Sequence, residues 1–136
     1  MELTKLAIAE RQLELACALY LAEEDYLGVV TLAGASEEIM GKLLQRQGRA
    51  AMIDHLIELD RELSGGRPFK VVNDEVNRAR NALKHANDPN EDLVVIEPGE
   101  ANAMLGRALV NLTLFGSTLT ETMVRAAQKL ATESGM

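Results

Sequence analysis

Apolar side chains recur at intervals of three and four residues along most of the chain, which is the period of amphipathic α-helices. This pattern predicts a first helix over residues 3–24, a second over 26–47 and a third over 50–63. Gly48 follows the second helix and provides its stop signal. Residues 64–68 (Ser-Gly-Gly-Arg-Pro) break the pattern. Because this run is too short for a domain linker, we interpret it as a turn.

The second half of the chain predicts two more helices. A fourth helix is expected from residue 69 to 85 or 86, followed by a polar turn over 87–92. The β-branched run 93–96 is expected to form a single extended segment packed over the bundle. A long last helix over 98–132 begins with a proline in its first turn, and the Gly-Ser pair at 116–117 is its expected kink or break.

These elements predict an all-α protein, an antiparallel bundle of four to five helices that occupies residues 1–136 as one domain. Hydrophobic residues make up 47% of the chain, but only two Tyr, two Phe and no Trp are present, so we expect an aliphatic core. The same shortage argues against stacking of nucleic-acid bases on aromatic side chains. The chain carries neither a signal peptide nor a membrane-spanning run, and we therefore expect a cytoplasmic protein.

The formal net charge of −7 argues against general nucleic-acid binding, for which a basic field supplies most of the affinity. The charge is uneven, however. Residues 42–85 hold nine of the 14 Lys and Arg against six acids, a net +3, and the rest of the chain carries −10. This difference predicts either a local positive surface or an ordinary solvated surface of mixed charge.

Several chemical classes are excluded by the residues present. Cys17 is the only cysteine, so neither an internal disulfide nor a cysteine-based zinc site can form. Neither histidine has a histidine four residues away or a Glu three residues before it, as helical metal sites require. No phosphate-binding or dinucleotide-binding fingerprint is present either. We therefore expect no metal and no cofactor.

One stretch near the end of the fourth predicted helix concentrates reactive residue types. Arg80 is followed by Asn81, three further residues and His85. This pattern resembles the signature of the HEPN domains (higher eukaryotes and prokaryotes nucleotide-binding), in which an Arg and a polar residue precede a His. Glu38 and Lys42, which stand four residues apart before apolar residues in the second helix, also fit the family.

A second match to the Arg-to-His spacing is interpreted as accidental. Arg49 and His55 have five residues between them, but an alanine occupies the polar position and His55 lies within the third predicted helix. The asparagine at the second position therefore distinguishes the match at Arg80.

The resemblance implies a homodimer that cleaves RNA without a metal, as a toxin or stress-response endoribonuclease does. On this hypothesis Arg80, Asn81 and His85 are the catalytic residues, and Lys84 and Lys42 bind substrate. The expected partners are RNA or a nucleotide, a second copy of the chain and an antitoxin-like protein. No membrane partner is expected.

Simple chemistry is compatible with these roles. Histidine is the side chain that titrates near neutrality, and arginine can grip two phosphate oxygens. Residues five apart on an ideal helix are separated by about 140° in projection. Arg80 and His85 therefore need either a helix end at His85 or a second copy in order to converge.

The alternative is a non-catalytic dimerisation module that binds a partner protein or a nucleotide. In that case Asn77, Asn81, Lys84 and His85 are a solvated helix face, with His85 complementing the helix dipole. Gly34 and Ala35 make the second helix slim, which favours helix–helix association. A homodimer is expected under both hypotheses.

Overall fold

A computed structural model of the protein describes residues 1–64, 67 and 69–133. All regular structure in these residues is helical, so the predicted all-α class is confirmed. The helices are α1 (Lys5–Leu21), α2 (Tyr26–Arg46), α3 (Met52–Ser64), α4 (Phe69–Val76), α5 (Arg78–Lys84), the 3-10 turn η1 (Pro89–Glu91), α6 (Pro98–Phe115) and α7 (Glu121–Glu133).

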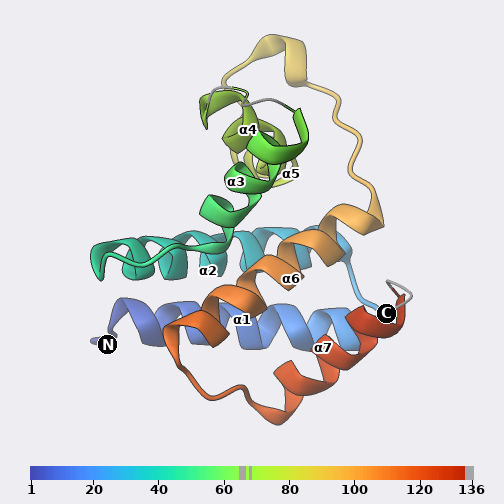
Figure 1. Ribbon diagram of the computed structural model, residues 1–136. Coiled ribbons are helices and arrows are strands. Elements are labelled where there is room, and N and C mark those ends of the chain that lie inside the picture. Colours follow the sequence, from blue (N-terminus) through green and yellow to red (C-terminus); the bar gives the residue numbers. More distant parts are fainter. Residues whose placement is uncertain (65–66, 68, 134–136) are drawn as a thin grey trace.

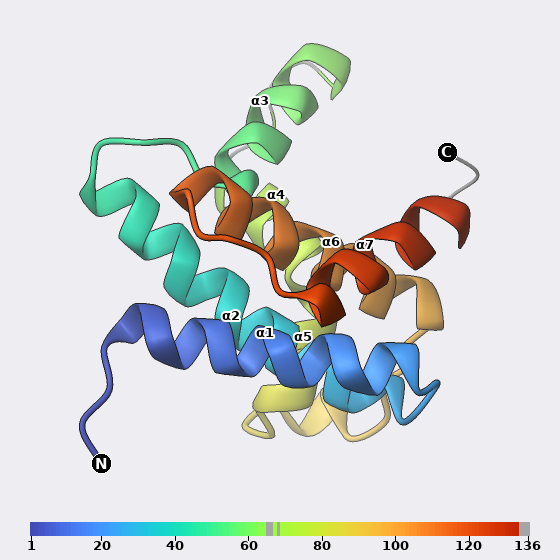
Figure 2. The same ribbon diagram turned by 90° about the horizontal axis from the view of Figure 1, so that it is seen from below.

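The core of the bundle lies around α2, which packs against α1 and against α6, and α6 crosses in front of the layer formed by α1 and α2 (Figure 1). α7 folds back beneath this layer onto α1. The short helix α5 also packs against α2, whereas α3 projects away from the bundle (Figure 2). As predicted, the core is aliphatic, and its large buried side chains include Leu13, Met40, Leu44, Leu105 and Leu112.

Local signals fix several helix ends. The Thr4 hydroxyl accepts a hydrogen bond from the N–H of Ala7 at 3.0 Å and so caps α1. The Asp25 carboxylate caps α2 in the same way, through the N–H of Leu27 at 2.9 Å. Gly116 ends α6 with φ of 98°, a left-handed conformation that favours glycine.

Two long predicted helices are each divided in the structure, which raises the helix count above the predicted four to five. The prediction of one long last helix is wrong, because α6 ends at Phe115 and α7 begins only at Glu121. The break lies at the predicted Gly-Ser pair. The predicted fourth helix is divided between α4 and α5 at Asn77, whose φ of −105° and ψ of 8° depart from helical values.

Of the predicted turn over 64–68, residues 65, 66 and 68 lie outside the described part of the chain. The segment 93–96 forms no strand, and it is not packed over the bundle along its whole length: Leu93 is 94% exposed and Val95 is 71% exposed. Among the described residues, none of the helices combines the length and apolarity needed to span a bilayer.

Cys17 belongs to α1 and is fully buried in the core of the bundle. Burial raises the pKa of its thiol to about 12, and the nearby Glu14 carboxylate acts in the same direction. Since the thiolate is the reactive form, Cys17 reacts with alkylating reagents only when the bundle opens. It therefore serves as an internal reporter of unfolding.

Candidate functional site

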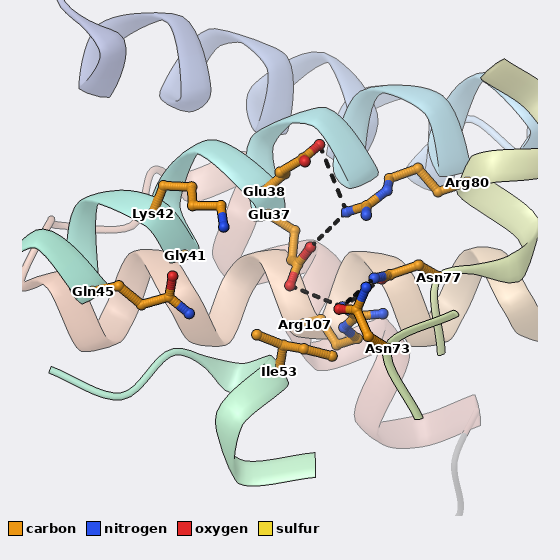
Figure 3. Close-up of a pocket in the computed structure, with 10 residues that line it drawn as sticks. All are labelled: Glu37, Glu38, Gly41, Lys42, Gln45, Ile53, Asn73, Asn77, Arg80 and Arg107. Atoms are coloured by element: carbon orange, nitrogen blue, oxygen red, sulfur yellow. Dashed lines mark hydrogen bonds and ion pairs between the residues drawn. The ribbon is translucent and has the colours of Figure 1, made fainter. Parts of the chain in front are cut away.

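Arg80 extends from α5 toward α2 and meets two adjacent carboxylates there (Figure 3). Its Nη1 lies 3.1 Å from Oε2 of Glu37 and 4.0 Å from Oε2 of Glu38. The stem of Arg80 crosses α2 at Gly34, where an added Cβ would lie 2.7 Å from Cδ of Arg80. Gly34 was expected to allow close packing between helices. In the structure it allows the close approach of one side chain, that of Arg80.

Glu37 is the centre of a buried polar network. It is only 3% exposed, and its two carboxylate oxygens have different partners. Oε2 accepts from Arg80, and Oε1 accepts from Nη2 of Arg107 on α6 at 2.9 Å. Arg107 also donates to Oδ1 of Asn77 at 2.9 Å and to the carbonyl of Val76 at 2.8 Å. The network thus ties α2 and α6 to the junction between α4 and α5.

Two guanidinium groups share one buried carboxylate, so the buried groups carry one more positive than negative charge, and the partly exposed Glu38 lies 4.0 Å from Arg80. Burial lowers the pKa of Arg107, and the attraction of Glu37 opposes this shift. Neutral oxygens from Asn77 and Val76 supply the further acceptors that Arg107 needs. Buried ion pairs of this kind hold a local geometry firmly, because a charge left without its partner is costly.

Two buried asparagines extend the network. Asn111 on α6 donates to the carbonyl of Glu37 at 3.0 Å and accepts from the N–H of Met52, at the start of α3, at 2.8 Å. Asn77 donates to Oδ1 of Asn73 at 3.2 Å. Asn77 is 3% exposed, so its predicted place on a solvated helix face is wrong, and it is a buried residue.

Two surface hollows meet at Arg80. The first, of about 160 Å³, is lined mainly by polar residues: Glu37, Glu38, Gly41, Lys42, Gln45, Ile53, Asn73, Asn77, Arg80 and Arg107 (Figure 3). The second, of about 270 Å³, is largely apolar and is lined by Thr31, Ala35, Glu38, Ile39, Arg80, Leu83 and Lys84. Arg80 and Glu38 are common to both, and a lysine lies on each side of them.

His85 lies at the end of α5, which is one of the two arrangements that the sequence required for convergence with Arg80. Its backbone is extended, with φ of −123° and ψ of 139°, and its N–H donates to the carbonyl of Asn81 at 3.0 Å. The side chain is exposed. Within the described residues, neither the imidazole of His85 nor the amide of Asn81 has a hydrogen-bond partner.

Lys42 and Lys84, the residues predicted to bind substrate, are both exposed. Lys84 lies 3.8 Å from Oε2 of Glu38, while Lys42 lines the first hollow. Glu38 therefore pairs with Arg80 and Lys84 across two helices and not with Lys42 on its own helix. The structure thus brings Arg80, Lys84 and Lys42 to one face and leaves His85 at the exposed end of α5.

Glu37, Arg107 and Asn111 were not among the predicted site residues, although they belong to the network beside Arg80. A signal for them was present, because each is polar at a position on the apolar face of its helix. Glu37 lies four residues after Ala33 and three before Met40, and both of these are fully buried. No group of three or more His, Cys, Asp or Glu side chains arranged to hold a metal ion occurs among the residues that the structure describes.

Replacing Gly34 with alanine is expected to displace Arg80 and loosen the network. Replacing a glycine in a helix interior with alanine normally raises the stability of the protein by roughly 1 kcal/mol. Here the new Cβ pushes against Cδ and Cγ of Arg80, at 2.7 and 2.8 Å, so overpacking should lower stability by about 1–3 kcal/mol instead. Urea unfolding measures the difference.

Gly106→Ala is the matched control for Gly34→Ala. Gly106 lies within α6, and nothing stands within 4 Å of a Cβ placed there, so this variant should be more stable than the wild type. Equal stability of Gly34→Ala and Gly106→Ala would contradict the contact between Arg80 and Gly34.

Comparison with known proteins leaves the site to be interpreted from its own chemistry. The chain matches no protein-family model, and neither a curated protein nor a solved structure is significantly similar to it.

Proposed function

We propose that this chain is a homodimeric, metal-independent endoribonuclease of the HEPN type, in which Arg80 binds the scissile phosphate and His85 transfers protons. The observation that carries the proposal is the state of Arg80. Only its Nη1 takes part in ion pairs, while Nη2 has no partner among the described residues, at the meeting point of two hollows. A guanidinium held in this way has donor capacity left for a phosphate oxygen.

The surrounding charges support an anionic ligand at this point. Lys42 and Lys84 lie on the two sides of Arg80, and the buried Arg107 adds positive charge beneath it. Glu37 uses both oxygens on the two arginines, so it fixes Arg80 without cancelling the whole positive charge. Preorganised positive charge is the main requirement for stabilising a phosphorane-like transition state.

RNA supplies its own nucleophile, the 2′-hydroxyl, and needs a base and an acid from the protein. A histidine that accepts the 2′ proton lets that oxygen attack phosphorus, and the P–O5′ bond breaks as its oxygen receives a proton. The products are a 2′,3′-cyclic phosphate and a free 5′-hydroxyl. Two copies of the chain supply two imidazoles, one for each proton transfer.

The second copy is expected to dock over the second hollow. Thr31, Ala35 and Ile39 follow one another along α2 at intervals of four residues, and Leu83 faces them from α5. These side chains are small or apolar and lie directly beside Arg80 and Lys84. A copy seated there brings its own His85 to the positive face of the first.

Cleavage of mixed RNA by the purified protein in EDTA, beside a His85→Ala variant, tests the proposal. We expect cleavage by the wild type and its loss in the variant, and light scattering should give a dimer for both. Equal cleavage by the two proteins, or none by either, would rule out the enzyme.

The second candidate is a non-catalytic dimerisation module. Its supporting observation is that Arg80 is a structural group within a buried network, with a side chain only 11% exposed. On this account His85 is a solvated helix end. A dimer in light scattering with no RNA cleavage by wild-type protein would select this function.

A further inference from the structure

Residues 93–96, between η1 and α6, expose an apolar run that the bundle leaves uncovered. The exposed fraction is 94% for Leu93, 42% for Val94 and 71% for Val95, while Ile96 is partly buried against the core. Exposure therefore alternates from residue to residue, as it does along an extended strand. Figure 1 shows this segment as an open stretch of chain leading down to α6.

Within the part of the chain that the structure describes, the bundle makes hydrogen bonds to the backbone of Val95 and Ile96 but not to that of Leu93 or Val94. Nη2 of Arg78 donates to the carbonyl of Val95 at 3.1 Å, and the Tyr26 hydroxyl donates to the carbonyl of Ile96 at 3.0 Å. No described residue makes a hydrogen bond to the backbone N–H or C=O of Leu93 or Val94. Unpaired strand groups of this kind are templates for the addition of another extended chain.

A hollow of about 370 Å³ accompanies the segment. It is lined by Tyr26, Leu27, Leu83, Val94, Val95 and Ile96. Tyr26 and Leu27 are 37% and 38% exposed, so the wall opposite the segment is also open to solvent. The apolar side chains of a bound strand thus have a place to enter.

Charge identifies the occupant. Residues 86–106 contain five acids and no Lys, Arg or His. Four of these acids, Asp88, Glu91, Asp92 and Glu97, are exposed and have no ion-pair partner among the described residues. RNA and anionic lipid are repelled by this field, and a second copy would place the same acids against each other.

We propose that residues 92–97 bind an extended segment of another protein in which apolar residues are flanked by Lys or Arg. The segment adds beside Leu93 and Val94, inserts alternate side chains at the hollow and pairs its basic residues with the acids around the run. The hollow beside this run adjoins the second hollow at Leu83 but includes neither Arg80 nor Lys84, and the inference does not depend on RNA cleavage.

The test measures fluorescence anisotropy of labelled synthetic peptides titrated with the full chain. One peptide carries a central run of alternating valine and threonine flanked by lysines, and the other has glutamates in place of the lysines. The proposal expects binding of the basic peptide only. The double variant Glu91→Lys and Asp92→Lys should weaken binding of the basic peptide roughly tenfold. Leu93→Ser with Val95→Ser should do the same through lost apolar burial.

A charge-matched control separates this surface from the overall acidity of the protein. Glu2→Lys with Glu62→Lys makes the same change of net charge at exposed positions elsewhere, and it should leave binding of the basic peptide unchanged. An equal loss in this control, or binding that survives Leu93→Ser with Val95→Ser, would overturn the proposal. A change of oligomeric state in the serine variant would also overturn it, because the run would then join two copies of this chain.

Discussion

Glu37→Gln is expected to destabilise the protein by about 3–5 kcal/mol, since it leaves two buried arginines without their shared charge. The two oxygens of Glu37 accept from different arginines, whereas glutamine has a single acceptor oxygen and an NH₂ group. One guanidinium must then face a donor inside the network. At this chain length the loss corresponds to a fall in Tm of roughly 10–15 °C, measured by circular dichroism.

Glu38→Gln is the control for that experiment. Glu38 is the next residue on the same helix and also pairs with Arg80, but its side chain is 45% exposed. Removal of its charge should therefore change stability by less than about 1 kcal/mol. The alkylation rate of Cys17 gives an independent readout and should rise in Glu37→Gln but not in Glu38→Gln. Equal effects of the two substitutions would show that Glu37 is not the centre of the network.

His85→Ala is expected to lower the rate of RNA cleavage by about 10²–10⁴-fold, the usual contribution of a positioned acid or base. The fold should not change, because the imidazole is exposed and has no hydrogen-bond partner among the described residues. His55→Ala removes the other histidine, which is also exposed and belongs to the Arg49 match interpreted as accidental. It should cleave at the wild-type rate. Loss of cleavage in both variants would contradict the interpretation that the Arg80–His85 match is functional and the Arg49–His55 match accidental.

Helix positions were predictable because they depend on local periodicity and on caps. α1, α2 and α3 begin and end within a few residues of the predicted ranges, and the break at Gly116 follows from a glycine that adopts positive φ. The division at Asn77 was not predictable from local pattern. Its side chain is turned inward by Arg107, thirty residues away, and no helical period encodes that contact.

The same reason explains what the sequence missed at the site. Glu37, Arg80 and Arg107 are distant in the sequence and meet only after α2, α5 and α6 pack together. A polar residue on an apolar face signals that a buried partner exists, but it does not identify the partner. Arg80 could be predicted as a site residue because the motif is local, while its ion pair with Glu37 became visible only in the structure.

The exposed run at 93–96 was misplaced for a related reason. A β-branched apolar run predicts burial in an isolated protein, and the sequence offered no other partner. In the structure, only Ile96 packs against the core, and Leu93 lies almost entirely in solvent.

The central claim is that the imidazole of His85 moves protons during RNA cleavage beside Arg80. The most direct measurement is the rate of RNA cleavage in EDTA by the wild type and by His85→Ala, with and without added imidazole. The account predicts cleavage by the wild type, its loss in the variant and partial recovery with imidazole. Wild-type protein that leaves RNA intact, or a His85→Ala variant that cleaves at the wild-type rate, would contradict it.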